Sequence, residues 1–245
     1  MIYKNTSFLI TIKQIKLINS LKLKKNRFKH NLFVVEGEKN VQELLNSNYE
    51  IHSLFATNAW KNKNPNIDVL EVSDAELNRI SNNKNPNKVL ALAKIKVQPF
   101  TNDSNIKLVL DDVKDPGNLG TIIRICDWFN VRSIICSKTT ADCYNSKVVQ
   151  ASMGSIFRVS IIYTDLLQYL KMIKSPIYCA CLDGENIKKV NFPKSMHLVI
   201  GNESKGIKED IINLKSNKVT IENFGSKTES LNVAIAASIF LHEIL

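Results

Sequence analysis

The sequence predicts an α/β protein with a parallel sheet in its C-terminal part and a smaller α/β domain in front of it. From residue 106 onward, short apolar strands alternate with segments long enough to form helices. These strands are continuous apolar runs, which is typical of a parallel sheet covered on both faces. A polar stretch at 98–105 interrupts all periodicity and indicates a domain boundary. We therefore expect a domain over 1–98, a linker over 99–105 and a second domain over 106–245.

In the front domain, apolar residues recur at helical spacing between Ile12 and Leu21, and Leu32–Val35 is a short apolar run. Apolar residues after Gly37 predict another helix. Further strands are expected at 51–56, 69–72 and 89–96, with a helix at about 73–80.

The second domain is expected to alternate strands and helices along its whole length. The predicted strands are 106–111, 131–136, 157–162, 177–181, 197–201 and 218–222. The predicted helices are 118–130, 144–153, 164–174, 207–214 and 230–244. Ligands of parallel sheets bind beyond the carboxyl ends of strands, so the loops after Leu110, Ile200 and Ile221 are the candidate site.

Length and composition exclude several classes of protein. The chain has 245 residues, of which 44% are hydrophobic, with 8 glycines and 6 prolines, so it is neither disordered nor collagen-like. No apolar stretch is long enough for a membrane span, and Lys13 and Lys16 interrupt the early apolar run, which argues against a signal peptide. Five cysteines without a CxxC pair suit neither a disulfide framework nor a zinc site. We expect a cytoplasmic protein that binds no metal.

Positive charge is concentrated near the N-terminus. The whole chain has a net charge of +10, and residues 1–104 carry 16 Lys and Arg against 9 Asp and Glu. Such asymmetry is typical of proteins that bind a polyanion. A solvated basic face produced by a Lys-rich composition is the alternative interpretation. The candidate polyanion contacts are Lys22, Lys24, Lys25, Arg27 and Lys29.

The first candidate loop runs from Asp111 into a predicted helix that begins near Asn118. At 100° per residue, Asn118 and Arg124 lie on the side of this helix opposite its apolar stripe. In isolation, Asn118 could instead be a simple helix N-cap and Arg124 a surface charge. Gly117 and Gly120 do not form a GxGxxG dinucleotide fingerprint.

The second loop, 201–207, has glycines on both sides of a lone acid, Glu203, and it contains no phosphate-binding GK[ST] motif. Gly201 would allow a ligand to approach the backbone closely, although a purely structural turn explains it equally well. The third loop leads from Ile221 into a helix that is apolar almost all round, which indicates burial or contact with a partner. Ser230 and Asn232 are candidate caps of that helix.

Together, the three loops resemble the ordered motifs of the SpoU (TrmH-like) RNA ribose methyltransferases of the SPOUT superfamily. The motifs are Asn118-x-Gly120-x-x-x-Arg124, Gly201-x-Glu203-x-x-Gly206 and Glu229-Ser230-Leu231-Asn232-Val233. The resemblance continues between them, through 127–129 and 147–154. In front, Lys24-Lys25-x-Arg27 followed by 33–37 is similar to the small substrate-binding domain of many such enzymes.

The resemblance implies a Rossmann-like domain with a deep trefoil knot, a homodimer, and methyl transfer from S-adenosylmethionine to a ribose 2′-hydroxyl of rRNA or tRNA. It assigns Arg124 to polarising or deprotonating the hydroxyl, and Asn118, Glu203, Ser230 and Asn232 to positioning Arg124 and the target nucleotide. The implied cofactor contacts are Leu198, Ile200, Gly201, Gly206, Ile221 and Leu231. RNA would be held by the basic front domain.

Two departures from the family pattern concern the third loop. Glu222 stands where the family usually has proline, and the stretch 225–230 is one residue longer than common versions. Both changes leave the proposed polar site residues intact but affect the loop expected to hold the cofactor. The alternative function is therefore a non-catalytic RNA-binding or ribosome-assembly protein that keeps the fold. A nucleotide-dependent oxidoreductase is a more distant alternative.

Overall fold

The computed structural model describes residues 10–83, 86–97, 105–225 and 227–245, and these form two compact units. The first unit contains 1–97 and 144–157, and the second contains 98–143 and 158–245. Residues 99–104 of the expected linker lie outside the described residues. The chain passes from the first unit to the second between 97 and 98, and the stretch 144–157 belongs to the first unit, whereas the sequence analysis placed it in the domain over 106–245.

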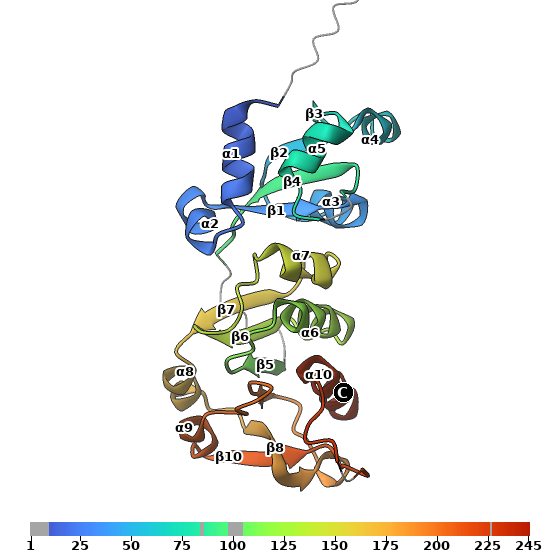
Figure 1. The fold of residues 1–245 in the computed structure, drawn as a ribbon. Helices are drawn as coiled ribbons and strands as arrows, with labels where there is room; N and C mark the ends of the chain where they lie inside the picture. Colours follow the sequence, from blue (N-terminus) through green and yellow to red (C-terminus); the bar gives the residue numbers. More distant parts are fainter. Residues whose placement is uncertain (1–9, 84–85, 98–104, 226) are drawn as a thin grey trace, which may run out of the picture. The chain divides into compact units, whose positions relative to one another are not determined.

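The first unit is an α/β unit built on a four-stranded mixed sheet in the order β1-β4-β2-β3 (Figure 1). Strand β4 pairs antiparallel with β1 and β2, while β3 is parallel to β2. The bounds are α1 Ile12–Ser20, α2 Lys24–His30, β1 Leu32–Glu36, α3 Glu38–Leu45, β2 Ile51–Ala56, α4 Asn58–Lys63, β3 Leu70–Glu71, α5 Asp74–Ile80, β4 Val89–Lys94, α7 Ser146–Ser152 and the 3₁₀ helix η1 Ser155–Phe157.

Aromatic packing explains why 144–157 belongs to the first unit. The ring of Tyr144 lies 4.6 Å from that of Phe33 on β1, and the ring of Phe157 lies 5.2 Å from that of Tyr49. Helix α7 also packs on β1. Apolar periodicity predicted the helix correctly but could not say which sheet it covers.

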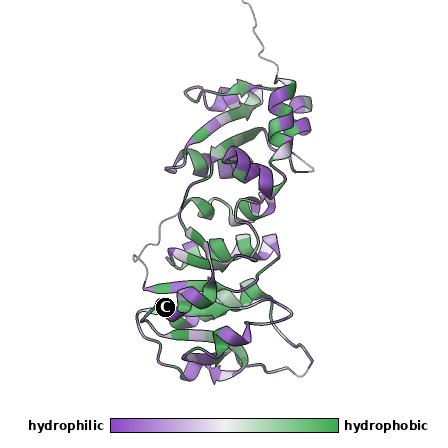
Figure 2. Ribbon diagram, turned by 90° about the vertical axis from the view of Figure 1, so that its left-hand side faces the viewer, coloured by the Kyte–Doolittle hydropathy of each residue, from purple (hydrophilic) through white to green (hydrophobic). Residues whose placement is uncertain are grey.

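The second unit contains a fully parallel sheet in the order β10-β8-β9-β5-β6-β7, which confirms the predicted parallel-sheet domain. Figure 2 colours much of this sheet as hydrophobic. The bounds are β5 Ile106–Leu110, α6 Pro116–Trp128, β6 Ser133–Ser137, β7 Ser160–Thr164, α8 Leu166–Met172, β8 Ile177–Asn186, the 3₁₀ helix η2 Ile187–Lys189, β9 Met196–Ile200, α9 Glu209–Ile212, β10 Ser216–Thr220 and α10 Val233–Ile244.

Strand register sorts the apolar side chains of the second unit between the two faces of its sheet. Side chains in one row of a sheet point to the same face, and a shift by one residue reverses the face. One row runs across five strands and packs with the buried residues of α8 and α9: Cys179, Val199, Val109, Ile135 and Ile162. Helices α6 and α10 lie on the other side of the sheet (Figure 1).

The five cysteines form no disulfide, and four of their side chains are buried. Burial raises the pKa of the Cys179 thiol to about 11 and that of Cys126 further still. These thiols are therefore protonated at neutral pH and pack as small apolar groups.

His197 on β9 is a buried, neutral histidine. Its Nε2 and Nδ1 atoms each lie 2.8 Å from a hydroxyl oxygen, of Tyr169 and Ser175 respectively. Burial lowers the pKa of His197 to about 4, with a smaller contribution from the charge of Lys107. In the unfolded chain an imidazole takes up a proton near pH 6.5.

The free energy of unfolding should therefore fall as the pH drops from 6.5 toward 4, because only the unfolded chain binds the extra proton in that range. The contribution of His197 reaches about 1.4 kcal/mol per pH unit. Urea denaturation at pH 7.0, 5.5 and 4.5 measures it: the stability advantage of the wild type over His197→Gln should shrink toward low pH. Parallel profiles for wild type and His197→Gln would contradict this assignment.

Candidate functional site

Two of the three candidate loops leave the sheet side by side because β5 and β9 are parallel neighbours. Leu110 is in register with Ile200, and the N–H of Asp111 donates to the carbonyl of Ile200 at 2.9 Å. The loops that follow these strands therefore begin at the same edge of the sheet, as expected for a ligand site of a parallel sheet.

The first loop ends at α6, which begins at Pro116 and not near Asn118. Asp115 is the N-cap, and its Oδ1 accepts a hydrogen bond from the N–H of Asn118 at 2.8 Å. Proline at the first helical position lacks only an N–H that has no helical partner there. Asn118 is therefore not the cap, and its side chain is available for other contacts.

The Asn118 amide joins all three candidate motifs. Its Nδ2 donates to Oε1 of Glu203 at 2.9 Å, and its Oδ1 accepts from Nδ2 of Asn232 at 3.0 Å. An amide offers a donor and an acceptor on one short side chain, whereas an aspartate or a leucine at 118 could not make both bonds. These two bonds bring Asn118, Glu203 and Asn232 together.

Asn232 is both a cap and a member of this network. Its Oδ1 accepts from the N–H groups of Ala234 and Ile235 at 3.0 and 3.4 Å, which makes it the N-cap of α10. Its Nδ2 then points to Asn118. The capping and functional interpretations of Asn232 are therefore compatible.

Asn202, which is not among the predicted site residues, organises the second loop. Its Nδ2 donates to the carbonyl of Asp112 at 2.9 Å, and its Oδ1 accepts from the N–H groups of Ser204 and Lys205. Its backbone pairs with Gly206. These bonds fix the turn that presents Glu203, and an Asn two residues before a serine in a glycine-rich loop is the only sequence signal of it.

The glycines of the second loop serve the loop itself. A side chain at Gly201 would collide with the backbone of Gly206 and Ile207, and Gly206 adopts φ +68°. The close approach predicted at Gly201 is thus made by the protein's own backbone.

The other predicted site residues occupy different environments. Arg124 is exposed on α6, two turns after Pro116, and no described residue forms an ion pair or hydrogen bond with it. Ser230 is exposed and lies just before α10. Among the predicted cofactor contacts, Leu198 and Ile200 are buried in β9, Ile221 is half-buried, and Leu231 is 45% exposed. Burial places Leu198 in the core of the sheet, and its contact with a cofactor stays a prediction.

Glu222, the unusual residue of the third loop, has a partner. Its Oε2 accepts from Nδ2 of Asn186 at 2.8 Å, at the end of β8. Nearby, the Asn223 amide donates to the carbonyl of Thr228 and accepts from the N–H of Gly225. Side-chain hydrogen bonds thus restrain a stretch where proline is usual in the resembling family.

The predicted polyanion contacts of the first unit divide into exposed and buried residues. Lys22, Lys24, Lys25 and Lys29 are exposed. Arg27 is only 3% exposed, and its Nη1 donates to the carbonyls of Leu21 and Lys22 at 2.8 and 3.0 Å. The prediction that Arg27 contacts RNA is therefore wrong, because its guanidinium is used to satisfy the turn between α1 and α2.

In the described residues, no group of three His, Cys, Asp or Glu side chains is arranged to hold a metal ion. In the same part of the chain, no helix is both long and apolar enough to cross a membrane.

Two models of known protein families match separate parts of the chain. The model of the SpoU rRNA methylase family matches residues 105–242, and that of the MRM3-like substrate-binding domain matches 13–91. A Bacillus subtilis relative, the 23S rRNA (guanosine(2553)-2′-O)-methyltransferase RlmP, is 27% identical over 231 residues. That match covers 91% of this chain and 92% of the relative.

Solved structures show the same similarity. A protein from Porphyromonas gingivalis assigned to the TrmH family of RNA methyltransferases is 34% identical with a TM-score of 0.86, and the match covers 96% of this chain and 98% of that one. The AdoMet-bound rRNA methyltransferase of Sinorhizobium meliloti is 27% identical with a TM-score of 0.82, and 96% of each chain is covered.

The network makes a measurable prediction about stability. Asn118→Ala should lower the free energy of unfolding by about 1–2 kcal/mol, because two hydrogen bonds are lost. In a double-mutant cycle with Glu203→Ala, the two substitutions should be coupled by about 1 kcal/mol although they are far apart in sequence. The exposed Lys205 provides the control cycle, Asn118→Ala with Lys205→Ala, which should be additive. Additivity of the Asn118 and Glu203 substitutions would show that the bond is absent in solution.

Proposed function

The chain belongs to the SpoU rRNA methylase family, and we propose that it transfers the methyl group of S-adenosylmethionine to a ribose 2′-hydroxyl of structured ribosomal or transfer RNA. The observation that carries this proposal is the hydrogen-bonded chain Glu203–Asn118–Asn232, which joins all three family motifs at one edge of the sheet. The names of the relatives support the substrate class.

The residues present fit a methyl donor that combines an adenosine with a charged chain. Leu231 and Ile221 offer partly exposed apolar surface for the adenosine. The main chain of Gly206 is paired with that of Asn202, and this pairing fixes the turn beside that surface. When bound, S-adenosylmethionine supplies a methyl group that is activated by the sulfonium it is attached to, and the sulfur is a good leaving group without a metal. We infer that these residues hold the donor.

The remaining chemical task is to make a ribose hydroxyl nucleophilic and to hold it in line with the methyl group. Arg124 is charged and exposed on the helix that carries Asn118. Its planar guanidinium can bind a phosphate of the RNA through two hydrogen bonds and stabilise negative charge that develops on the sugar oxygen. Glu203, Ser230 and Asn232 are proposed to position Arg124 and the nucleotide.

The topology of the second unit supports the proposal of a trefoil knot. Strand β10 forms one edge of the sheet, yet α10, which follows it, packs against α6, and α6 follows the interior strand β5. Between them, the chain returns through the stretch 221–232. We propose that this return threads the chain as in other members of the family, an exception to the rule that protein chains avoid knots.

Exposed apolar side chains on α6 and α10 support a homodimer. The two helices pack together, with Asn232 bonded to Asn118 near their starts and the Phe129 ring 6.4 Å from that of His242 near their ends. On this helix pair, Trp128 is 85% exposed and Ile235 is 53% exposed. We propose that a second copy of the chain covers these two exposed apolar side chains.

The basic first unit is proposed to hold the RNA, with Lys22, Lys24, Lys25 and Lys29 as exposed contacts. Such contacts neutralise phosphates, so the affinity should fall steeply as salt rises. Free thiols suit a reducing compartment, and we propose that the protein works in the cytoplasm.

The role of Arg124 can be tested by substitution. Arg124→Ala should lower methyl transfer at least about 100-fold, because a charge that stabilises the transition state is lost. Its affinity for S-adenosylmethionine should change less than about twofold if Arg124 contacts RNA and not the donor. Transfer of labelled methyl to total RNA from cells that lack this protein measures the first quantity, and calorimetry measures the second.

The exposed Arg132, whose Nε donates to Oδ1 of Asn130, is the matched control, and Arg132→Ala should keep full transfer. Undiminished transfer by Arg124→Ala would refute the assigned role. If the wild type does not bind millimolar S-adenosylmethionine, the non-catalytic RNA-binding alternative is favoured.

The dimer makes a separate prediction. Ile235→Asp should convert the protein from about twice 27.7 kDa to the 27.7 kDa monomer in sedimentation, because a buried carboxylate opposes association. Met172 on α8 is 76% exposed on the opposite side of the sheet. Met172→Asp should therefore leave the dimer unchanged. A wild type that sediments as a monomer at micromolar concentration would contradict the interface.

A further inference from the structure

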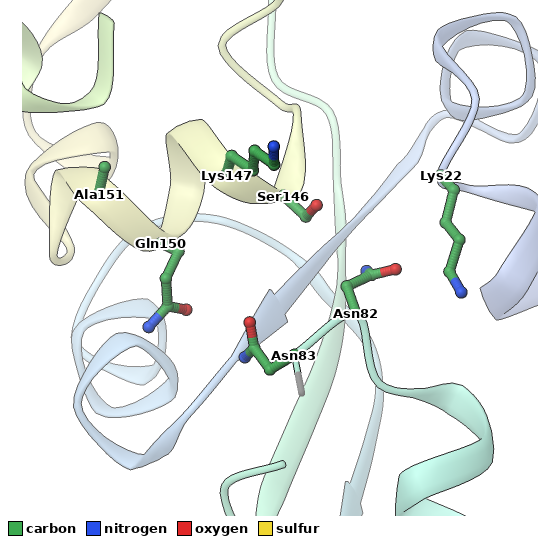
Figure 3. Close-up of a pocket in the computed structure, with 7 residues that line it drawn as sticks. All are labelled: Lys22, Asn82, Asn83, Ser146, Lys147, Gln150 and Ala151. Carbon is green, nitrogen blue, oxygen red and sulfur yellow. The ribbon is translucent and has the colours of Figure 1, made fainter. Parts of the chain in front are cut away.

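The first unit contains a polar hollow of about 500 Å³ that the proposed reaction does not use (Figure 3). It lies among the turn after α1, the loop after α5, and α7. The lining residues are Lys22, Asn82, Asn83, Ser146, Lys147, Gln150 and Ala151. These side chains provide two ammonium groups, three amides and a hydroxyl, and no carboxylate.

A buried carboxylate fixes the loop that lines one side of the hollow. Glu36, at the end of β1, is 7% exposed. It accepts hydrogen bonds from the Ser81 hydroxyl at 2.6 Å, the Asn82 N–H at 2.7 Å and the Asn83 Nδ2 at 3.1 Å. A buried carboxylate with three donors is well satisfied and holds its partners firmly. The loop is therefore a preformed part of the hollow.

These bonds determine which atom Asn83 presents. Because its Nδ2 donates to Glu36, its Oδ1 faces away from that carboxylate and is left as an acceptor. In Figure 3 this oxygen points up toward the side chains of α7. No described residue donates a hydrogen bond to it.

Gln150 on α7 is oriented in a similar way. Its Oε1 accepts from Nδ2 of Asn40 at 3.2 Å, and the same Nδ2 donates to the carbonyl of Glu36 at 3.2 Å. Asn40 is 3% exposed, so this arrangement is held in the core. In Figure 3 the side chains of Gln150 and Asn83 extend from α7 and from the loop after α5 into the same hollow, and each amide oxygen has a free lone pair.

The two lysines complete the chemistry. Lys22 and Lys147 approach the hollow from different elements, and the described residues offer neither ammonium an acidic partner. Two unpaired ammonium groups attract a phosphate, while a pair of amide acceptors reads N–H donors on the edge of a nucleobase.

We propose that this hollow binds one unpaired nucleotide of the substrate RNA, with Lys22 and Lys147 on its phosphates and the Asn83 and Gln150 oxygens on the amino group of its base. This inference rests on the proposed RNA methyltransferase function. The nucleotide is a second contact that selects the substrate, apart from the nucleotide that receives the methyl group. Adenine, cytosine and guanine carry an exocyclic amino group, and uracil does not.

Five labelled RNA hairpins with the same stem test the proposal, one fully paired and four with a single bulged A, C, G or U. In fluorescence anisotropy at a fixed salt concentration, the wild type should bind the A, C or G bulge about tenfold more tightly than the paired hairpin. The U bulge should gain less. Equal affinity for all five hairpins would overturn the proposal.

Variants separate the hollow from general charge. Lys147→Ala should remove most of the preference for a bulge while changing affinity for the paired hairpin only a few-fold. Lys63, exposed at the end of α4 in the same unit and outside the hollow, is the control, and Lys63→Ala should keep the preference. Equal losses for paired and bulged hairpins in Lys147→Ala, or the same effect from Lys63→Ala, would show that the lysine acts only through net charge.

Gln150→Met, of similar size but without the acceptor, should bind the U bulge as tightly as the A, C and G bulges. Thermal unfolding checks that Gln150→Met is folded. If this variant does not fold, the comparison of Lys147→Ala with Lys63→Ala tests the proposal. Calorimetry with cytidine and uridine 5′-monophosphates tests a free nucleotide: binding of these without any preference among the hairpins would overturn the assignment to RNA.

Binding of S-adenosylmethionine, measured on the same samples, separates the two proposals. If the protein binds this donor but has no preference for a bulge, only the proposal that the hollow binds a nucleotide is contradicted. If the protein prefers a bulge but does not bind the donor, only the proposal of methyl transfer is contradicted.

Discussion

The organisation of the site depends on one amide that both donates and accepts. Asn118 lies between a carboxylate and a second amide, so three loops far apart in the sequence are held in one orientation. Two other features prepare it for this role. The register of β5 and β9 brings the first two loops to the same edge, and Asp115 takes over the capping that would otherwise occupy the Asn118 side chain. The site is therefore a product of strand pairing and helix capping more than of any single reactive group.

The strands of the second unit were predictable because buried parallel strands are continuous apolar runs. Each of the six predicted strands is present, displaced by at most a few residues. The short helices α2 and α4 were not predicted, since Lys24–His30 is mostly basic and Asn58–Lys63 is mostly polar. Tertiary packing stabilises such helices, and periodicity over fewer than two turns carries little information.

The polar residues of the site were predictable to different degrees. Parallel strands end at a common edge, so the predicted sheet pointed to the loops that carry Asn118 and Glu203, whereas Asn232 was grouped with them only by the family resemblance. Asn202 was missed because its bonds are to backbone groups that no spacing reveals. Arg27 was misassigned because charge indicates nothing about burial, and a guanidinium has enough donors to satisfy a turn of its own chain.

The polypeptide crosses between the two compact units three times, near residues 97, 143 and 157. A single cut after residue 97 would thus release a module that lacks Tyr144 and Phe157, the aromatic partners of Phe33 and Tyr49. If this gene recombined with that of a relative at the codon for residue 97 alone, each hybrid chain would combine the rings at 33 and 49 from one parent with those at 144 and 157 from the other. Exchange of the first unit between related chains therefore requires matched changes in two separate stretches of the gene.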